Sequence, residues 1–104
     1  MNDMLMNLSS FKNKFVYKVE HGETLKEIAE KFNTTRQILI VDNCLGEEPN
    51  EGDILYVAVP NGKEYIVKPF DSLESLSDGD KSKEREIIKR NKVDYIYVGQ
   101  KIYI

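Results

Sequence analysis

Cysteine and histidine are almost absent from this sequence. Its 104 residues include one cysteine, Cys44, one histidine, His21, and no tryptophan. A single cysteine excludes an intrachain disulfide and a cysteine-rich metal site, and one histidine with scattered carboxylates is a poor basis for zinc binding. Small secreted domains are often held together by disulfides, so the lack of them favours a reducing compartment.

His21 and Cys44 could act as a nucleophilic pair only if the fold brought them together beside a third, orienting group. The sequence offers no such group. We therefore interpret His21 as a solvent-facing turn residue and Cys44 as a small apolar residue at a helix end. We expect no enzyme activity, no cofactor and no bound metal.

Long apolar runs are also missing, since no segment approaches the roughly 18 apolar residues that a membrane helix needs. The first 15 residues, MNDMLMNLSSFKNKF, lack the basic start and the apolar core of a secretory signal. The net charge is −3 and the pI about 5.2, which argues against a phosphate-binding surface of clustered lysine and arginine. These features predict synthesis in the cytoplasm and neither a membrane nor a nucleic-acid partner.

The sequence does contain an internal repeat, which emerges when it is displaced by 48 positions against itself. Glu23-Thr24 then aligns with Asp71-Ser72, and the endings ILYV (54–57) and KIYI (101–104) align after one deleted residue. The identical pairs include Tyr17 and Tyr65, Val19 and Val67, Leu25 and Leu73, Ile40 and Ile88, and Asn43 and Asn91. The chain therefore consists of two related units.

Each unit has the pattern strand, helix, helix, strand. Alternating apolar residues predict the strands, and apolar residues spaced three and four apart predict the helices. The pattern predicts an α+β fold of two tandem modules, each with a two-stranded antiparallel sheet and two helices packed on one face. We place an N-terminal extension at residues 1–13, the first module at 14–59, a linker at 60–64 and the second module at 65–104.

Hydroxyl side chains predict where the four helices begin. In the first unit, Thr24 precedes one helix and Thr34 the next, each with a Glu or Gln three residues later, which is the spacing of a capping box. In the second unit, we expect Ser72 and Ser82 to cap the corresponding helices.

The second unit is less regular than the first. Its first helix has Ser77 and Asp80 where the other unit has Ala29 and Phe32, so the apolar stripe fails and we expect this helix to end early. We therefore expect the second unit to be the less stable when isolated. The linker Pro60-Asn61-Gly62 is short enough for the modules to touch.

These residues resemble the LysM family, small βααβ modules that bind glycans. The family pattern runs roughly Y-x-V-x-x-G-D-T-L-x-x-I-A, then an Asn at the end of a second helix, then G-x-x-L-x-I. Here the first unit has YKVEHGETLKEIA, DN and GDILYV, and the second has YIVKPFDSLESLS, RN and GQKIYI. The resemblance covers about residues 15–104 and implies non-catalytic binding of N-acetylglucosamine polymers, which are peptidoglycan or chitin.

The resemblance also implies where the ligand binds, in a shallow groove between the loop after the first strand and the loop before the second. Backbone groups in such loops can bind an N-acetyl group, and tandem weak sites gain through effective concentration. In the first unit, the implied residues are Gly22, Glu23, Thr24, Gly46 and Pro49. In the second unit, they are Phe70, Asp71, Ser72, Val93 and Ile96.

Several of these positions have a second interpretation. Glu23 and Asp71 either support a helix N-terminus or contact the ligand. Phe70, in place of the loop glycine Gly22, either reshapes its loop or offers a ring for stacking on a sugar. Tyr95 and Tyr97 are further binding candidates in the last loop.

A protein-docking role is the alternative to glycan binding. LysM-like units also occur in spore-coat and phage-tail assemblies, where contacts to other proteins can dominate. The acidic residues Glu47, Glu48 and Glu51 around Pro49 and the absence of a secretory signal favour this alternative. In either case we expect association with a cell wall, a spore or a phage particle.

Overall fold

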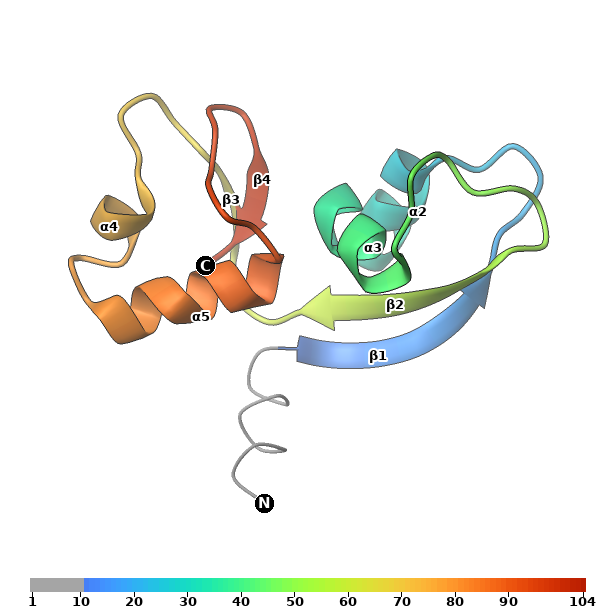
Figure 1. The fold of residues 1–104 in the computed structure, drawn as a ribbon, viewed down its shortest axis with the longest axis horizontal. Helices are drawn as coiled ribbons and strands as arrows, with labels where there is room; N and C mark the ends of the chain where they lie inside the picture. The colour runs from blue at the N-terminus through green and yellow to red at the C-terminus, as the bar shows by residue number, and fades with distance from the viewer. Residues whose placement is uncertain (1–10) are drawn as a thin grey trace, which may run out of the picture.

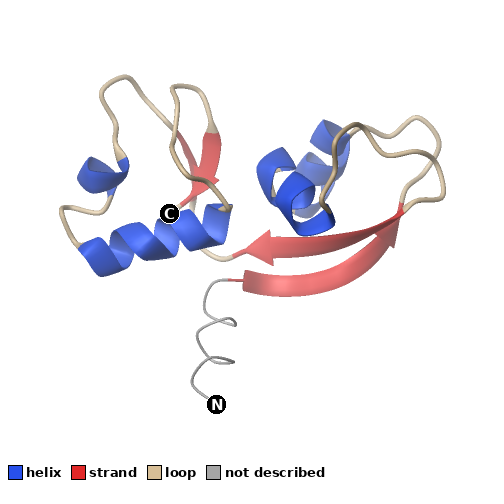
Figure 2. Ribbon diagram, in the orientation of Figure 1, coloured by secondary structure: helices blue, strands red, loops and turns tan. Residues whose placement is uncertain are grey.

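The computed structural model of the protein describes residues 11–104 as two similar units in succession (Figures 1 and 2). The first unit contains β1 (Phe11–Lys18), α2 (Leu25–Phe32), α3 (Arg36–Asn43) and β2 (Ile54–Pro60). The second contains β3 (Glu64–Ile66), α4 (Leu73–Leu76), α5 (Lys81–Asn91) and β4 (Lys101–Tyr103). The strands of each unit pair antiparallel with each other, so the α+β fold of two βααβ modules is confirmed.

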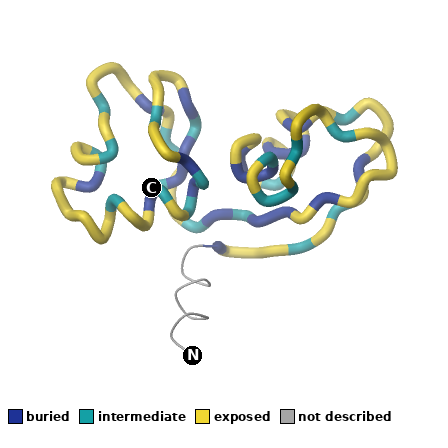
Figure 3. The backbone as a smooth tube through the Cα atoms, viewed as in Figure 1, coloured by how far each residue is buried: buried dark blue, intermediate teal, exposed yellow. Residues whose placement is uncertain are grey.

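The two units differ in the size of their sheets and cores. In the first, β1 and β2 pair from Phe11 opposite Pro60 to Lys18 opposite Ile54, whereas β3 and β4 pair only from residue 64 to residue 66. The core of the first unit comprises Val19, Leu25, Ile28, Ala29, Leu39, Leu55 and Val57. The core of the second comprises Val67, Ile87 and Ile102 (Figure 3). Less apolar surface is therefore buried in the second unit, which supports the expectation that it is the less stable.

The helix caps follow the sequence expectation in two cases of four. Thr24 and Ser72 both cap their helices and both form capping boxes. The cap of α3, however, is Thr35 rather than Thr34. Thr34 is fully buried and its hydroxyl donates to the Ala58 carbonyl at 2.8 Å, because a buried hydroxyl requires a partner.

The expected cap of α5 was also wrong. Asp80 caps this helix, and its Oδ1 accepts from the backbone N–H groups of Ser82 and Lys83 at 2.9 and 3.3 Å. Ser82 lies inside the first turn. A carboxylate is favoured at this position because it also interacts with the positive end of the helix dipole. The early end of α4, at Leu76, agrees with the failed apolar stripe.

The strands extend beyond the expected module boundaries. β1 already includes Phe11, which falls within the expected extension of residues 1–13, and the Phe11 ring is buried against Ile38 and Ala58. β2 ends at Pro60 and β3 begins at Glu64, so both ends of the expected linker, 60–64, lie in strands. Proline is tolerated at Pro60 because it stands at the end of a strand, where a backbone donor is dispensable.

The linker and the first unit hold the second unit in contact, as the short linker predicted. The Gln37 amide Nε2 donates to the Lys92 carbonyl at 2.9 Å. The Lys92 ammonium lies 3.8 Å from Asp42 Oδ1 and 5.3 Å from the centre of the Phe11 ring. At Gly62, where φ is 101°, a Cβ atom would lie 2.8 Å from the Ile104 carbonyl oxygen, so glycine alone fits this close approach.

A single asparagine closes the open edge of the sheet in each unit. Asn91 Nδ2 donates to the carbonyls of Ile87 and Tyr103, both at 2.8 Å, and its Oδ1 accepts from Tyr103 N at 2.7 Å. Asn43 makes the same three bonds to Leu39 and Tyr56. The amide therefore satisfies one N–H and one C=O of the free strand edge and joins that strand to the second helix.

We expect Asn91→Ala to lower the free energy of unfolding of the second unit by about 1–3 kcal/mol, because the Tyr103 N–H and carbonyl lose their partner inside the core. The loss should be smaller for Asn43→Ala, since Asn43 is half-buried and water can reach its partners, whereas Asn91 is 1% exposed. Urea denaturation followed by amide signals of each unit measures both. Asn50→Ala, an exposed loop asparagine, is the control, and equal stability of Asn91→Ala and the control would contradict the role given to the amide.

Candidate functional site

Glu23 holds together the first loop of the first unit. Its Oε1 accepts hydrogen bonds from the Tyr17 hydroxyl at 2.6 Å and from the Glu20 N–H at 2.7 Å. The Lys31 ammonium lies 2.8 Å from its Oε2, and the side chain is 14% exposed. Lys31, then Tyr17 and the Glu20 N–H, lower the pKa of Glu23 to about 2. The carboxylate is therefore committed to the protein, and Glu23 supports the loop rather than presenting a free ligand group.

Asp71 has the same role in the second unit, with fewer partners. It accepts from the Tyr65 hydroxyl at 2.5 Å and from the Lys68 N–H at 2.8 Å. These two bonds, the first above all, lower the pKa of Asp71. The position equivalent to Lys31 is Gly79, so the ion pair of Glu23 has no counterpart here, although the charge of Lys68 also lowers the pKa of Asp71 slightly.

Thr24 and Ser72 use their hydroxyls as helix caps. Thr24 Oγ1 accepts from the Glu27 N–H at 3.2 Å, and Ser72 Oγ accepts from the Ser75 N–H at 3.0 Å. Both side chains lie at the groove, but their substitution would remove a cap worth about 1 kcal/mol as well as any ligand contact.

Two acidic side chains connect the two loops at this end of the first unit. Glu48 reaches from the second loop to the first, and its Oε1 accepts from the Leu25 N–H at 2.7 Å. Its other oxygen lies 3.8 Å from Arg36 Nη2, and Glu51 contacts His21 at 2.9 Å. The loop carrying Gly46 and Pro49 thus lies beside the loop carrying Gly22, as the resemblance implied. The Leu25 N–H at the start of α2, which a ligand could otherwise use, is already bonded to the Glu48 carboxylate.

The predicted residues of the second loop in the second unit serve its core. Val93 is 5% exposed, and Ile96 is half-buried against the cluster of Val67, Ile87 and Ile102. Val93 therefore has almost no surface for a ligand, whereas Ile96 keeps part of its side chain exposed. The neighbouring rings of Tyr95 and Tyr97 are 72% and 59% exposed. Sequence periodicity could not predict which of these loop side chains are buried and which are exposed, because an irregular loop has no fixed alternation of inward and outward residues.

Phe70 is the most exposed large apolar residue of the described chain. Its relative exposure is 100%, and its backbone is left-handed with φ of 73°. The equivalent residue in the first unit, Gly22, has φ of 77°. The loop therefore keeps the shape that suits glycine, and phenylalanine adopts that shape at a cost of roughly 1–2 kcal/mol. Of the two interpretations of Phe70, the φ that it shares with Gly22 favours an exposed ring over a reshaped loop.

His21 lies in a turn and Cys44 at a helix end, as expected from the sequence. The His21 ring contacts Glu51 and its side chain is 93% exposed. Cys44 caps the end of α3 in a left-handed conformation, φ 53°, and is also exposed. Over residues 11–104, no three His, Cys, Asp or Glu side chains are grouped so that they could hold a metal ion. Within the same range, no helix is long and apolar enough to cross a membrane.

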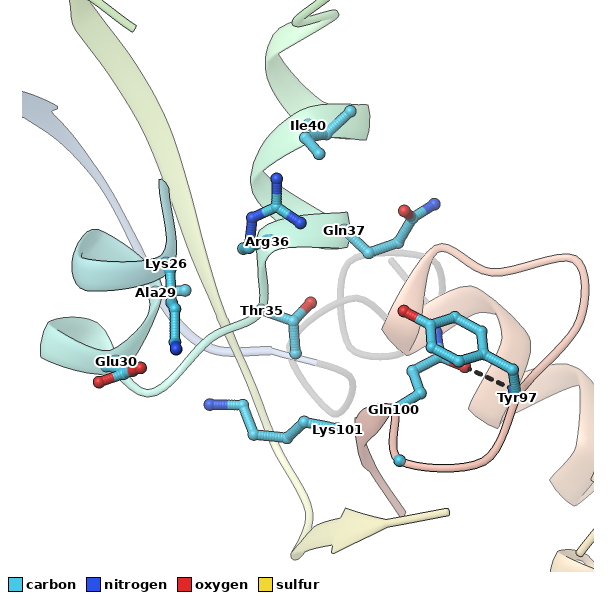
Figure 4. Close-up of a pocket in the computed structure, with 11 residues that line it drawn as sticks. Lys26, Ala29, Glu30, Thr35, Arg36, Gln37, Ile40, Tyr97, Gln100 and Lys101 are labelled. Carbon is cyan, nitrogen blue, oxygen red and sulfur yellow. Dashed lines mark hydrogen bonds between the residues drawn. The ribbon is translucent and has the colours of Figure 1, made fainter. Parts of the chain in front are cut away.

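A pocket between the two units was not predicted from the sequence (Figure 4). Its volume is about 370 Å³, and it lies between α2 and α3 of the first unit and the last loop of the second. Among the side chains that line it are Lys26, Arg36, Gln37, Tyr97, Gln100 and Lys101. These residues belong to separate repeats, so no local motif could have grouped them.

Comparison with known proteins places both units in one family. The family model described as LysM domain matches residues 17–57 and 65–104. The endolysin of Bacillus phage PZA is 33% identical over 93 residues, which cover 83% of this chain and 36% of the endolysin. The structure of the Bacillus cereus spore cortex-lytic enzyme SleL is similar over 88% of this chain and 22% of that chain, with 27% identity and a TM-score of 0.42. The chain thus spans about a third of the endolysin's length.

The bonds of Glu23 predict a stability that depends on pH. Its folded-state pKa of about 2 lies below the ordinary value of 4.5, so its contribution is fully present above about pH 4.5 and is lost as the pH falls toward 2. We expect Glu23→Gln to be less stable than the wild type at pH 6, and the difference to shrink between pH 4.5 and pH 3.

Urea denaturation at several pH values measures this difference. Glu47→Gln removes an exposed carboxylate from the same unit and controls for net charge. A gap between Glu23→Gln and the wild type that stays constant with pH would exclude the proposed titration.

Proposed function

Because the chain belongs to the LysM domain family, we propose that it binds N-acetylglucosamine-containing glycans, bacterial peptidoglycan in particular, without catalysing a reaction on them. The ligand lies in shallow grooves between the loop after the first strand and the loop before the second strand of each module, residues 14–59 and 65–104. A match to part of an endolysin agrees with a role at the bacterial wall.

The observation that carries this proposal is the conformation and exposure of Phe70. A fully exposed phenylalanine gains nothing from burial, and its left-handed backbone costs energy that the glycine of the other unit avoids. Folding therefore gives no reason for the ring. A sugar ring has an apolar face that can cover it, so contact with a glycan provides the reason.

The second unit is accordingly the principal binding unit. Its groove loops carry exposed rings at Phe70 and Tyr95, which suit an uncharged sugar. The first unit has Glu48 over the start of α2 instead, and this carboxylate competes with a ligand for the Leu25 N–H. The first unit thus contributes weakly by itself and gains from being tethered to the second.

Protein docking remains the second candidate, because the first unit exposes apolar residues outside its groove. Val16 and Tyr56 are opposite each other in the sheet, and Ile54 lies two residues from Tyr56 on the same strand. Their exposures are 67%, 44% and 61%. This outer face is the surface that a protein partner in an assembly would cover.

Phe70→Gly separates the role of the ring in folding from its role in binding. We expect this variant to be more stable than the wild type, by about 1 kcal/mol, because glycine adopts the left-handed conformation freely. We expect its affinity for a chitin pentamer to fall about three- to tenfold, since the apolar contact is lost. Asp78→Gly, which relieves a left-handed residue with φ of 54° outside the groove loops, should keep the affinity of the wild type.

A heteronuclear NMR titration with the chitin pentamer and then with a peptidoglycan fragment measures these affinities. Shifts at residues 70–72 and at Tyr95 support the second-unit groove, and Tyr56→Ala should leave them unchanged. If no signal moves at millimolar ligand, glycan binding is wrong and the outer face of β1 and β2 becomes the surface to test with protein partners.

A further inference from the structure

The pocket between the two units has more basic than acidic side chains in its lining. The side chains of Lys26, Arg36 and Lys101 line it, against one acidic residue, Glu30. This is an unusual concentration of positive charge in a chain whose net charge is −3. Its volume of about 370 Å³ falls in the range of small-molecule sites, roughly 300–1,000 Å³.

The positive charges of this pocket are only partly neutralised by the protein. Arg36 lies 3.8 Å from Glu48, and Lys101 lies 3.8 Å from Glu64. Such long, partly exposed pairs are weak and readily exchanged for another anion. Lys26 forms no ion pair within residues 11–104. Lys26 and Lys101 come from different units and extend into the same pocket (Figure 4), so a bound anion would relieve their mutual repulsion.

The rest of the lining suits a sugar beside the anion. Tyr97 is 59% exposed and offers a ring, and Gln37 and Gln100 are amides. Gln100 is fixed in place, because its Oε1 accepts from the Tyr97 N–H at 3.0 Å (Figure 4). Gln37 is fixed by its bond to the Lys92 carbonyl in the other unit. The pocket is therefore built by the contact between the units and not by either unit alone.

The pocket also adjoins both grooves. Arg36 faces the pocket and contacts Glu48, the residue that spans the groove of the first unit. Tyr97 and Gly99 line the pocket and belong to the last loop of the second unit. A glycan chain bound along these loops would thus bring its substituents close to the three cations.

We propose that the pocket between the two units binds a carboxylate of the peptidoglycan chain, with the ammonium groups of Lys26 and Lys101 as its partners (Figure 4), Arg36 adding positive charge at the pocket wall, and Tyr97 against the adjacent sugar. This assignment rests on the proposed glycan binding and adds the feature that distinguishes peptidoglycan from chitin. The carboxylate is either the lactyl group of N-acetylmuramic acid or one from the attached peptide, and the two share the chemistry that the cations recognise.

Two oligomers of equal length test the proposal by calorimetry. One is a chitin tetrasaccharide, which is neutral, and the other is a peptidoglycan tetrasaccharide whose peptides have been removed, which keeps its lactyl carboxylates. We expect the acidic oligomer to bind about tenfold more tightly in low salt, and the preference to shrink at about 0.3 M salt because the charges are partly exposed.

The double variant Lys26→Gln, Lys101→Gln should remove this preference and leave the affinity for the chitin tetrasaccharide unchanged. The matched control is Lys89→Gln with Lys18→Gln, which removes two exposed lysines outside the pocket lining. The control should keep the preference. If both double variants lose it equally, net charge rather than the pocket is responsible and the proposal is overturned.

Further outcomes separate this proposal from glycan binding itself. Equal affinity of the wild type for the two oligomers, and for one that keeps its peptides, overturns the carboxylate site and leaves glycan binding standing. Tighter binding of only the peptide-bearing oligomer supports the site and identifies the peptide as the source. If no oligomer binds, but N-acetylmuramic acid alone shifts the amide signals of Tyr97 and Gln100, the pocket is supported and the grooves are not. If that probe also fails, both proposals are wrong.

Discussion

The open edge of a two-stranded sheet is the constraint on which this fold depends. Each unit has only two strands, so β2 and β4 each have one edge without a neighbouring strand. Asn43 and Asn91, each the last residue of the second helix, make two hydrogen bonds to that edge and a third to a carbonyl of their own helix. The helix is thereby fixed to the sheet, and the loop between them takes its position from both. The same attachment places the second helix over the core of each unit.

A second shared device shapes the loop after the first strand. A strand tyrosine donates to a carboxylate six residues later, and the carboxylate also accepts a backbone N–H of the loop, in Tyr17 with Glu23 and in Tyr65 with Asp71. The two units share these hydrogen bonds, but the residues around them differ. The first copy adds Lys31 and Glu48 and directs its polar groups toward one another. The second has fewer such bonds and exposes aromatic rings.

The two units therefore differ in what they contribute to the protein. The first has the larger sheet and core and contributes stability, and the second has the more open and apolar loops. Joining them generates a surface that neither has alone, the pocket of Lys26, Arg36 and Lys101. The proposed glycan sites of the two units and this pocket lie in one chain, so a polymer that contacts them together would bind more tightly than a fragment that contacts one of them.

The sequence by itself determined the repeat, the order of the elements and most of their ends, because these depend on interactions between residues close in the chain. Thr24, Ser72 and the short α4 are examples, and so is the equivalence of Asn43 with Asn91. At the start of α3, Thr35 is the cap because Thr34 is buried and bonded to the Ala58 carbonyl. At the start of α5, Asp80 is the cap rather than Ser82, because its carboxylate also interacts with the helix dipole. The spacing of residues along the chain reveals neither the burial of a hydroxyl nor the effect of the helix dipole.

Only the tertiary structure decided which of the candidate site residues are free to act. The carboxylates of Glu23 and Asp71 are bonded to tyrosine hydroxyls. Val93 is buried, and Phe70 is exposed with the left-handed φ that Gly22 has in the other unit. Each of these outcomes depends on partners that lie across a loop or in the other strand. The pocket between the units depends on the packing of one repeat against the other, and a pattern that repeats along the chain carries no information about how its copies meet in space.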